Sequence, residues 1–217
     1  MFLLLYKVQI FTNVGYTALN SWQMKILISQ IEYIKPVRNF VFDALERQYY
    51  RFLAGHTLLP VPNMIKVPDV EYDCLILTGG PDSVARNQTE NLLYQDAVEK
   101  GKPIVGICHG AFVINDLCGG KLGSIEGHVD KDIEITLEGN KHTVKCYHSQ
   151  SIKALAEDFV AIAHDNDGNI EAFKHKTLPV YGIVWHPERM DEPVLPSEVA
   201  DLLRTDHLDL LNLFPTI

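Results

Sequence analysis

A cysteine at the end of an apolar segment is the first residue in this sequence whose surroundings suit catalysis. Cys108 directly follows the segment 103–107 (PIVGI), and His109 and Gly110 then lead into a helical pattern. A strand-to-helix turn of this kind holds a thiol away from the sheet, and a neighbouring glycine leaves room for strained backbone. The N-terminus of the following helix favours a thiolate and offers free N–H groups to an oxyanion. The pattern indicates a nucleophile, although a buried structural cysteine fits the turn alone equally well.

A histidine and a glutamate stand together at the end of a second apolar segment. The segment 180–184 (VYGIV) runs into the sequence WHPE at 185–188. The carboxyl ends of parallel strands gather along one edge of a sheet, so this segment brings its histidine towards the cysteine turn. A histidine can act as general base and then as general acid, while a carboxylate orients and stabilises the imidazolium. We therefore expect Cys108, His186 and Glu188 to form a catalytic triad.

The first half of the chain alternates between short apolar segments and helical patterns. The segments with the composition of buried strands are 25–29, 57–62, 73–78 and 103–107. The stretches with a helical pattern are 38–54, 89–100 and 109–118. This alternation predicts an α/β fold in three layers, with a mostly parallel, doubly wound sheet between two layers of helices.

The second half of the chain changes to a succession of short strands. The five predicted strands are 132–139, 142–149, 159–165, 169–175 and 180–186. The sequence DNDG at 165–168 is a strong signal for a hairpin, and the amphipathic stretch 197–213 predicts a helix. We expect these strands to add an antiparallel part to the parallel sheet.

Composition excludes several classes of protein. The 217 residues are 47% hydrophobic, which suits one sizeable domain that needs no metal or disulfide to fold. A formal net charge of −9 argues against nucleic acid or an anionic membrane as the main partner. The four cysteines form no CxxC pair, so we expect reduced thiols and a cytoplasmic location.

The N-terminus needs a separate interpretation. The segment 1–10 is apolar, but it is too short for a membrane span and no clean cleavage site follows it. A better strand starts near Met24. We therefore expect residues 1–23 to be an extension of uncertain status, and 24–217 to be a single domain.

Several spaced motifs resemble the class I glutamine amidotransferase and γ-glutamyl hydrolase families. The similarity runs over residues 24–190, and the motifs keep the order that they have in those families. The matching segments are LILTGGPDS (75–83), RNQTENLLYQDAVEKGKPIVGICHGAFVIN (86–115), YHSQSI (147–152), DGNIEAF (167–173) and VYGIVWHPE (180–188). The resemblance implies cleavage of a γ-glutamyl amide through a glutamyl thioester, with release of glutamate.

The same resemblance implies roles for residues around the thiol. The backbone N–H groups of Gly80 and His109 would form the oxyanion hole. The implied substrate-binding residues are Gly79, Phe112, His148 and Gln150. No metal or organic cofactor is expected, because the sequence has neither a metal-ligand cluster nor a nucleotide-type phosphate loop.

Three positions depart from the family pattern. Phe112 and Val184 stand where these families usually have glutamine, and Ser149 replaces the second histidine of a His-His-Gln segment. None of the three belongs to the expected triad. We therefore expect cleavage chemistry to be kept, but free glutamine to be a poorer substrate than a bulkier γ-glutamyl amide.

The identity of the acceptor stays open at this stage. The segment 28–53 is similar to a subgroup linked to cell-surface polysaccharide pathways, some members of which hydrolyse γ-glutamyl-CDP-amidate. Alternatively, the protein is a glutaminase subunit that passes ammonia to a separate synthase, since no synthetase domain lies in this sequence.

Two other classes of protein compete with these interpretations. A related protease and chaperone-like superfamily also carries Cys-His-Gly and uses the adjacent histidine, but it usually continues with proline where this chain has Ala111. An inactive binding subunit is the non-enzymatic alternative, and retention of all three triad residues argues against it.

The remaining cysteines and histidines are interpreted as structural. Cys74 and Cys118 are expected to pack in the interior, and Cys146 is expected to share a strand face with His148 in the core rather than to bind a metal. Arg86 and Asn87 are expected to cap a helix rather than to touch substrate. The other histidines are scattered without ligand spacing: His56, His128, His142, His164, His175 and His207.

Overall fold

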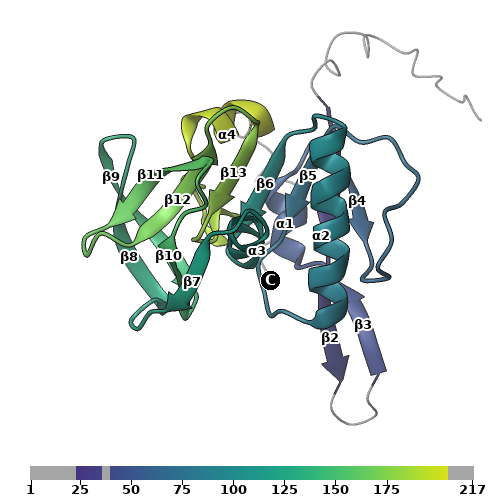
Figure 1. The fold of residues 1–217 in the computed structure, drawn as a ribbon, viewed down its shortest axis with the longest axis horizontal. Coiled ribbons are helices and arrows are strands. Elements are labelled where there is room, and N and C mark those ends of the chain that lie inside the picture. Colours follow the sequence, from purple (N-terminus) through teal and green to yellow (C-terminus); the bar gives the residue numbers. More distant parts are fainter. Residues whose placement is uncertain (1–22, 36–39, 205–217) are drawn as a thin grey trace, which may run out of the picture.

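An 11-stranded mixed sheet is the centre of the computed structural model, which describes residues 23–35 and 40–204. The strand order is β4-β1-β5-β6-β13-β12-β11-β8-β9, with β10 and β7 attached through β12. The expected α/β fold, with a parallel core and added antiparallel strands, is confirmed. Figure 1 shows the parallel strands and the antiparallel strands as two neighbouring parts of the molecule.

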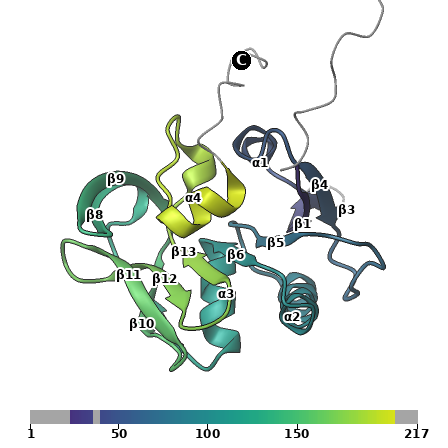
Figure 2. The ribbon, with the colours of Figure 1, turned by 90° about the horizontal axis from the view of Figure 1, so that it is seen from above.

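Five strands pair in parallel and carry the helices. They are β4 (Thr57–Val61), β1 (Lys25–Ser29), β5 (Cys74–Leu77), β6 (Ile104–Ile107) and β13 (Val180–Ile183). The helices are α1 (Arg47–Phe52), α2 (Val84–Glu99), α3 (His109–Leu117) and α4 (Ser197–Leu203), with a 3₁₀ turn, η1, at Pro187–Arg189. In Figure 2, α2 and α3 cover one face of the parallel strands, while α1 and α4 lie on the other. The expected three layers are therefore present.

The antiparallel part continues the same sheet beyond β13. Its strands are β12 (Ile170–His175), β11 (Phe159–Asp165), β8 (Val129–Leu137), β9 (Asn140–Tyr147), β10 (Gln150–Ala154) and β7 (Lys121–Ser124). The predicted hairpin at 165–168 joins β11 to β12, and the Asp165 carboxylate accepts the N–H groups of Asp167 and Asn169 within it. The short strands β7 and β10 were not expected from the sequence.

The predicted helix 38–54 is wrong over its first half. Residues Phe40–Ala44 form β3, which pairs with β2 (Ile31–Lys35) in a separate antiparallel hairpin, and only α1 is helical. Aromatic and β-branched residues favour a strand, and Phe40, Val41 and Phe42 are consecutive rather than spaced along one helix face. The helical period held only where Tyr49 and Phe52 pack inward.

Two other predicted boundaries also moved. The helix expected at 89–100 begins at Val84, because the Ser83 hydroxyl accepts the N–H of Arg86 and caps it, and it ends before Gly101 at φ +62°. The helix expected at 197–213 is seen as α4, and the rest of that range lies outside the described residues. The predicted N-terminal extension lies outside them too, apart from Gln23.

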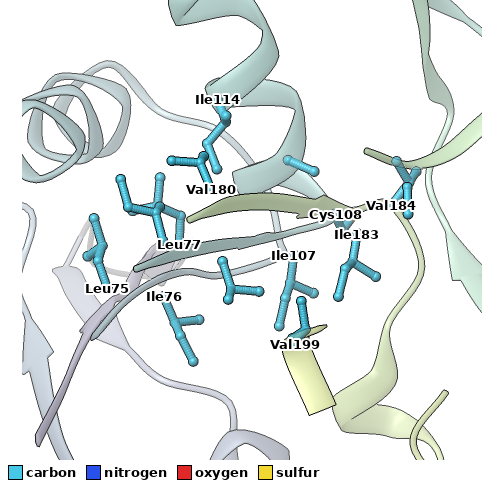
Figure 3. Packing of buried hydrophobic residues seen from close by; sticks show 14 of the residues in the cluster. Leu75, Ile76, Leu77, Ile107, Cys108, Ile114, Val180, Ile183, Val184 and Val199 are labelled. Carbon is cyan, nitrogen blue, oxygen red and sulfur yellow. The ribbon is translucent and has the colours of Figure 1, made fainter. Parts of the chain in front are cut away.

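The hydrophobic core sits on both faces of the parallel strands. Figure 3 shows Leu75 and Leu77 of β5 and Ile107 of β6 between Ile114 of α3 and Val199 of α4. These side chains are fully buried. Such packing is expected to make the carboxyl ends of β6 and β13 a rigid platform. No helix in the described residues is long and apolar enough to cross a membrane.

Candidate active site

Cys108 occupies a strained turn at the carboxyl end of β6. Its backbone angles are φ 49° and ψ −102°, a region that residues with a Cβ rarely adopt, and α3 begins at the next residue. The turn is compressed against β5, since a Cβ on Gly110 would lie 2.2 Å from the Leu77 carbonyl oxygen. The glycine is therefore required for α3 to approach the sheet, and the strained thiol position predicted from the sequence is present.

His186 and Glu188 follow β13 and lie beside this turn. The Nδ1 atom of His186 is 2.6 Å from Oε1 of Glu188, which leaves Nε2 as the ring nitrogen available to the Cys108 thiol. Both side chains are buried. A Cβ on Gly79 would meet His186 Cε1 at 2.6 Å and Cys108 Cβ at 3.4 Å, so Gly79 lies between the two parts of the site. The three predicted triad residues thus form one connected group.

The charge state of His186 is set by its two neighbours. Burial alone would lower the pKa of the imidazole, but hydrogen bonds to Cys108 and Glu188, with the charges of both, raise this pKa to about 9. A protonated His186 ring is therefore favoured at neutral pH. Such an arrangement can activate a thiol and later donate a proton to a leaving group.

A pocket of about 450 Å³ opens in front of the thiol. Its walls include Cys108, His186 and most of the residues predicted to bind substrate. The lining residues are Gly80, Pro81, Asp82, Cys108, His109, Phe112, Tyr147, His148, Ser149, Gln150, His186 and Arg189. The size is in the range of small-molecule sites.

Two predicted contributors do not line the pocket. Gly79 donates its N–H to the Tyr49 hydroxyl at 3.0 Å and is buried beneath the turn. Val184 is fully buried, and its N–H donates to the Glu171 carbonyl oxygen. Gly79 therefore lies beneath the turn rather than at the pocket surface, and Val184 belongs to the core.

The amides of Gly80 and His109 are suitably placed for an oxyanion. Both residues line the pocket, and His109 is the first residue of α3, where an N–H has no partner within the helix. In the described part of the chain neither amide donates a hydrogen bond. Their free N–H groups agree with the predicted oxyanion hole.

A buried ion pair under these two amides was missed in the sequence. Arg86 and Glu90 are fully buried on α2 and joined at 2.9 Å, four residues apart. The helix cap predicted at Arg86 is instead formed by the Ser83 side chain. The Arg86 guanidinium also donates to the carbonyl oxygens of Thr78 at 2.6 Å and Pro81 at 2.8 Å. These contacts fix both ends of the glycine turn.

Glu90 extends the same cluster to the other half of the oxyanion site. Its Oε2 is 3.2 Å from Nε2 of His109, and its Oε1 accepts the Ser29 hydroxyl at 2.7 Å. Burial would raise the pKa of Glu90, but the neighbouring His109, Arg86 and Ser29 lower it overall. The His109 ring therefore faces Glu90 rather than solvent, which also disfavours its use as the catalytic histidine.

Aromatic and basic residues complete the pocket on the side of His186. The Tyr147 ring meets the His186 ring edge-on at 5.3 Å, and Arg189 lies over Tyr147 at 4.5 Å while it pairs with Glu46 at 2.8 Å. Tyr147 is the first residue of the motif at 147–152, and Arg189 directly follows the motif at 180–188, but neither residue was expected to line the pocket.

Two groups of side chains among the described residues could hold a metal ion. The first is Cys146, His148 and Glu171, and the second is His128, Asp165 and Glu171. His128 has no ligand spacing in the sequence, as expected, but β11 and β12 bring Asp165 and Glu171 to it from distant parts of the chain.

Comparison with known proteins identifies relatives of this chain. The family model described as glutamine amidotransferase class-I matches residues 39–203. The sequence is 32% identical over 162 residues to a subunit of the glutamine-hydrolyzing GMP synthase of Methanosarcina barkeri, a match that covers 69% of this chain and 81% of the relative. It is 33% identical over 124 residues to the γ-glutamyl-CDP-amidate hydrolase of Campylobacter jejuni, over 53% of this chain and 62% of the relative.

Solved structures share the fold at low sequence identity. The crystal structure of a glutamine amidotransferase from Methylobacillus flagellatus aligns with a TM-score of 0.59 and 16% identity, over 87% of this chain and 92% of that chain. A glutamine amidotransferase from Thermotoga maritima aligns with a TM-score of 0.58 and 13% identity, over 76% of each chain.

Proposed function

Because the chain belongs to the class I glutamine amidotransferase family, we propose that it hydrolyses a γ-glutamyl amide with Cys108, His186 and Glu188 as its catalytic triad. The observation that carries the proposal is the strained Cys108 turn beside a buried His186 whose other nitrogen is held by Glu188 at 2.6 Å. Membership of the family supports amide cleavage in general, whereas the roles of the individual residues rest on this geometry.

The first half of the reaction forms a thioester. The Cys108 thiolate attacks the carbonyl carbon of the γ-glutamyl group, and the carbonyl oxygen takes up negative charge next to the N–H groups of Gly80 and His109. His186 then gives its proton to the leaving nitrogen, and the C–N bond breaks. The amine or ammonia departs, and a glutamyl thioester remains on Cys108.

The second half returns the enzyme to its starting state. His186, now neutral, removes a proton from water, and the resulting hydroxide attacks the thioester carbon. The C–S bond breaks, glutamate is released and the thiolate is restored beside the imidazolium. Glu188 holds the ring in the required orientation through its contact with Nδ1, and these steps need no metal or organic cofactor.

The pocket wall favours a substrate larger than glutamine. Phe112 and Ser149 both line the pocket, at positions where the families named above usually have polar side chains. Each hydrogen bond lost to a polar substrate group costs about 1–3 kcal/mol, while a larger leaving group regains energy through its own contacts. One relative is named a γ-glutamyl-CDP-amidate hydrolase, which supports a nucleotide-linked amide as one substrate to test.

A glutaminase subunit is the second candidate function. Several relatives are named as subunits of a glutamine-hydrolyzing GMP synthase, which supports an ammonia-donating role with a separate synthase chain. The two candidates differ in the substrate that the isolated chain prefers.

The experiment is a screen of glutamate release by the isolated protein. The substrates are free glutamine, γ-glutamyl dipeptides and γ-glutamyl nucleotide amides. We expect kcat/KM for glutamine to be at least about tenfold below that of the best amide. Glutamine turnover equal to or above every larger amide would instead favour the ammonia-donating role.

A further inference from the structure

A group of metal-ligating side chains is buried behind one wall of the pocket. Cys146 lies near the end of β9, His148 follows that strand, and Glu171 lies on β12. Their exposed fractions are 0%, 4% and 1%. The ligating sulfur, nitrogen and oxygen atoms all lie within 4.8 Å of one another. Three different donor types thus converge on one point in the interior.

The orientation of the His148 ring shows which atom is free to bind. Its Nδ1 is 2.8 Å from the Gln150 carbonyl oxygen, and because a carbonyl can only accept, Nδ1 carries the hydrogen. In the neutral ring Nε2 therefore presents a lone pair. This nitrogen is buried and makes no hydrogen bond within the described residues. A histidine whose other nitrogen donates to a backbone carbonyl is the usual form of a metal ligand.

The distances in the group fit a coordination shell better than a hydrogen-bond network. His148 Nε2 is 3.6 Å from Glu171 Oε2, and Cys146 Sγ is 4.0 Å from the same oxygen. Strong hydrogen bonds are shorter, and two lone pairs that face each other repel. Ligands about 2.0–2.3 Å from a zinc ion lie about 3.3–3.7 Å apart around a tetrahedron. The distance from His148 to Glu171 lies within this range, and the distance from Cys146 to Glu171 exceeds it by about 0.3 Å. The Cys146 sulfur and the His148 nitrogen lie within 4.8 Å of each other.

We propose that Cys146, His148 and Glu171 bind a zinc ion, with a water molecule as the fourth ligand. One thiolate, one neutral imidazole and one carboxylate match the borderline-soft preference of Zn²⁺, and their two negative charges balance its charge. The Nε2 atom of His128 is 3.1 Å from the Asp165 carboxylate and lies 3.7 Å from the other oxygen of Glu171, next to the proposed site. Cys146 lies in the hydrophobic core, as expected, and the proposal gives its thiol a ligand role there as well.

The zinc ion would act on the pocket wall and not on the reacting bond. His148 lines the pocket, and its ring packs against Phe112 with centroids 6.0 Å apart. An ion bound behind His148 holds this wall in place, and the pocket provides its route of entry. The proposal does not depend on the proposed substrate or triad.

Cobalt and zinc titrations of the full chain test this site. The Cys108→Ala variant is used as the background, so that the active-site thiol cannot bind the metal. After treatment with a chelator and dialysis, we expect one equivalent of Co²⁺ to give a thiolate-to-cobalt charge-transfer band that Zn²⁺ removes. A hundredfold excess of Zn²⁺ over its dissociation constant is expected to raise the unfolding midpoint by about 5–10 °C.

Matched cysteine variants decide the assignment. Adding Cys146→Ser is expected to abolish the band and the thermal shift, whereas adding Cys74→Ser, at an equally buried thiol, keeps both. If Cys146→Ser unfolds the protein, His148→Gln provides the same comparison with the thiol retained, and is expected to weaken Co²⁺ binding at least about tenfold. No charge-transfer band in the Cys108→Ala background, or an unchanged band without Cys146, would overturn the proposal.

Discussion

Two buried polar clusters reach the pocket, and they differ in the side chains that face their central carboxylate. The cluster of Arg86 and Glu90 reaches it through His109, and the contacts of the Glu90 carboxylate with Ser29, Arg86 and His109 lie between 2.7 and 3.2 Å. The cluster around Glu171 reaches it through His148, with contacts of 3.6–4.0 Å. Both are buried, and both mix histidine with a carboxylate.

The difference indicates two separate tasks. A buried charge must be paired with an opposite charge or bound to a metal, since removal from water costs several kcal/mol. Arg86 meets that requirement for Glu90 within the chain, so the first cluster is a rigid support for the oxyanion amides. Among the described residues no lysine or arginine forms an ion pair with Glu171, and this is the reason to assign a cation to the second cluster.

The largest expected effect concerns the thiol that both clusters flank. Cys108→Ala is expected to lower kcat by at least about 10⁴-fold while the fold is kept, because the attacking atom is lost. Steady-state glutamate release and circular dichroism measure the two parts of this prediction. His186→Ala is expected to lose more activity than Glu188→Gln, since the proton transfer is a larger task than the orientation of the ring. If Cys108→Ala kept more than a few per cent of the activity, Cys108 would not be the nucleophile. The two clusters would then no longer flank the reacting atom.

The next effect breaks the paired cluster. Glu90→Gln leaves the buried Arg86 without its counter-ion, which is expected to cost about 3–5 kcal/mol of folding stability. Loss of this ion pair is also expected to displace the amides of Gly80 and His109 from the proposed oxyanion hole. The weaker stabilisation of the oxyanion is expected to lower kcat by about 10²–10³-fold. Denaturant unfolding and glutamate release measure the two losses. Glu99→Gln, at an exposed position on the same helix, is the matched control, and equal behaviour of both variants would contradict the supporting role.

A smaller effect, on the pH dependence of folding stability, tests whether the charge of His186 depends on Cys108 and Glu188. The pKa of His186 is raised above its ordinary value of 6.5 to about 9. A raised pKa adds stability that is fully present below pH 6.5 and is lost as the pH rises through about 9. The shift corresponds to about 3 kcal/mol in the free energy of unfolding. Denaturant unfolding at both ends of this pH range measures the loss, and His186→Gln, which lacks the titrating group, is the control. In Cys108→Ala the loss is expected at lower pH, and an unchanged profile would argue against the thiol contact.

The smallest effect on activity is expected when metal is removed from the cluster around Glu171. Exhaustive treatment with a chelator is expected to leave kcat within about twofold, because the proposed triad uses no metal. The unfolding midpoint is expected to fall in the same sample as zinc leaves Cys146, His148 and Glu171. Activity lost to the chelator and restored by zinc would show that the second cluster serves catalysis directly.

Local patterns in the sequence predicted the parallel half and the residues of the proposed triad. A short apolar strand that ends in a cysteine, with a glycine two residues further on, predicts a strained strand-to-helix turn, because the chain has few ways to pass from strand to helix so sharply. The segment 180–188 is equally local, since its strand, its histidine and its glutamate are consecutive. The expected oxyanion amides of Gly80 and His109 also belong to segments adjacent to strands. The helical period failed at 40–44, where strand pairing with 31–35 overrode it.

Only the tertiary structure decided which buried side chains meet. Arg86 carried the pattern of a helix cap, and its burial against Glu90 and the carbonyl of Thr78 depends on the packing of α2 onto β5. Glu171 and Cys146 are 25 residues apart, and no spacing rule joins them. Their approach depends on the pairing of β8 with β9 and of β11 with β12. The periodicity of the sequence predicts the face of a helix or strand on which a residue lies. Which side chains it contacts on that face depends on how the strands and helices pack together.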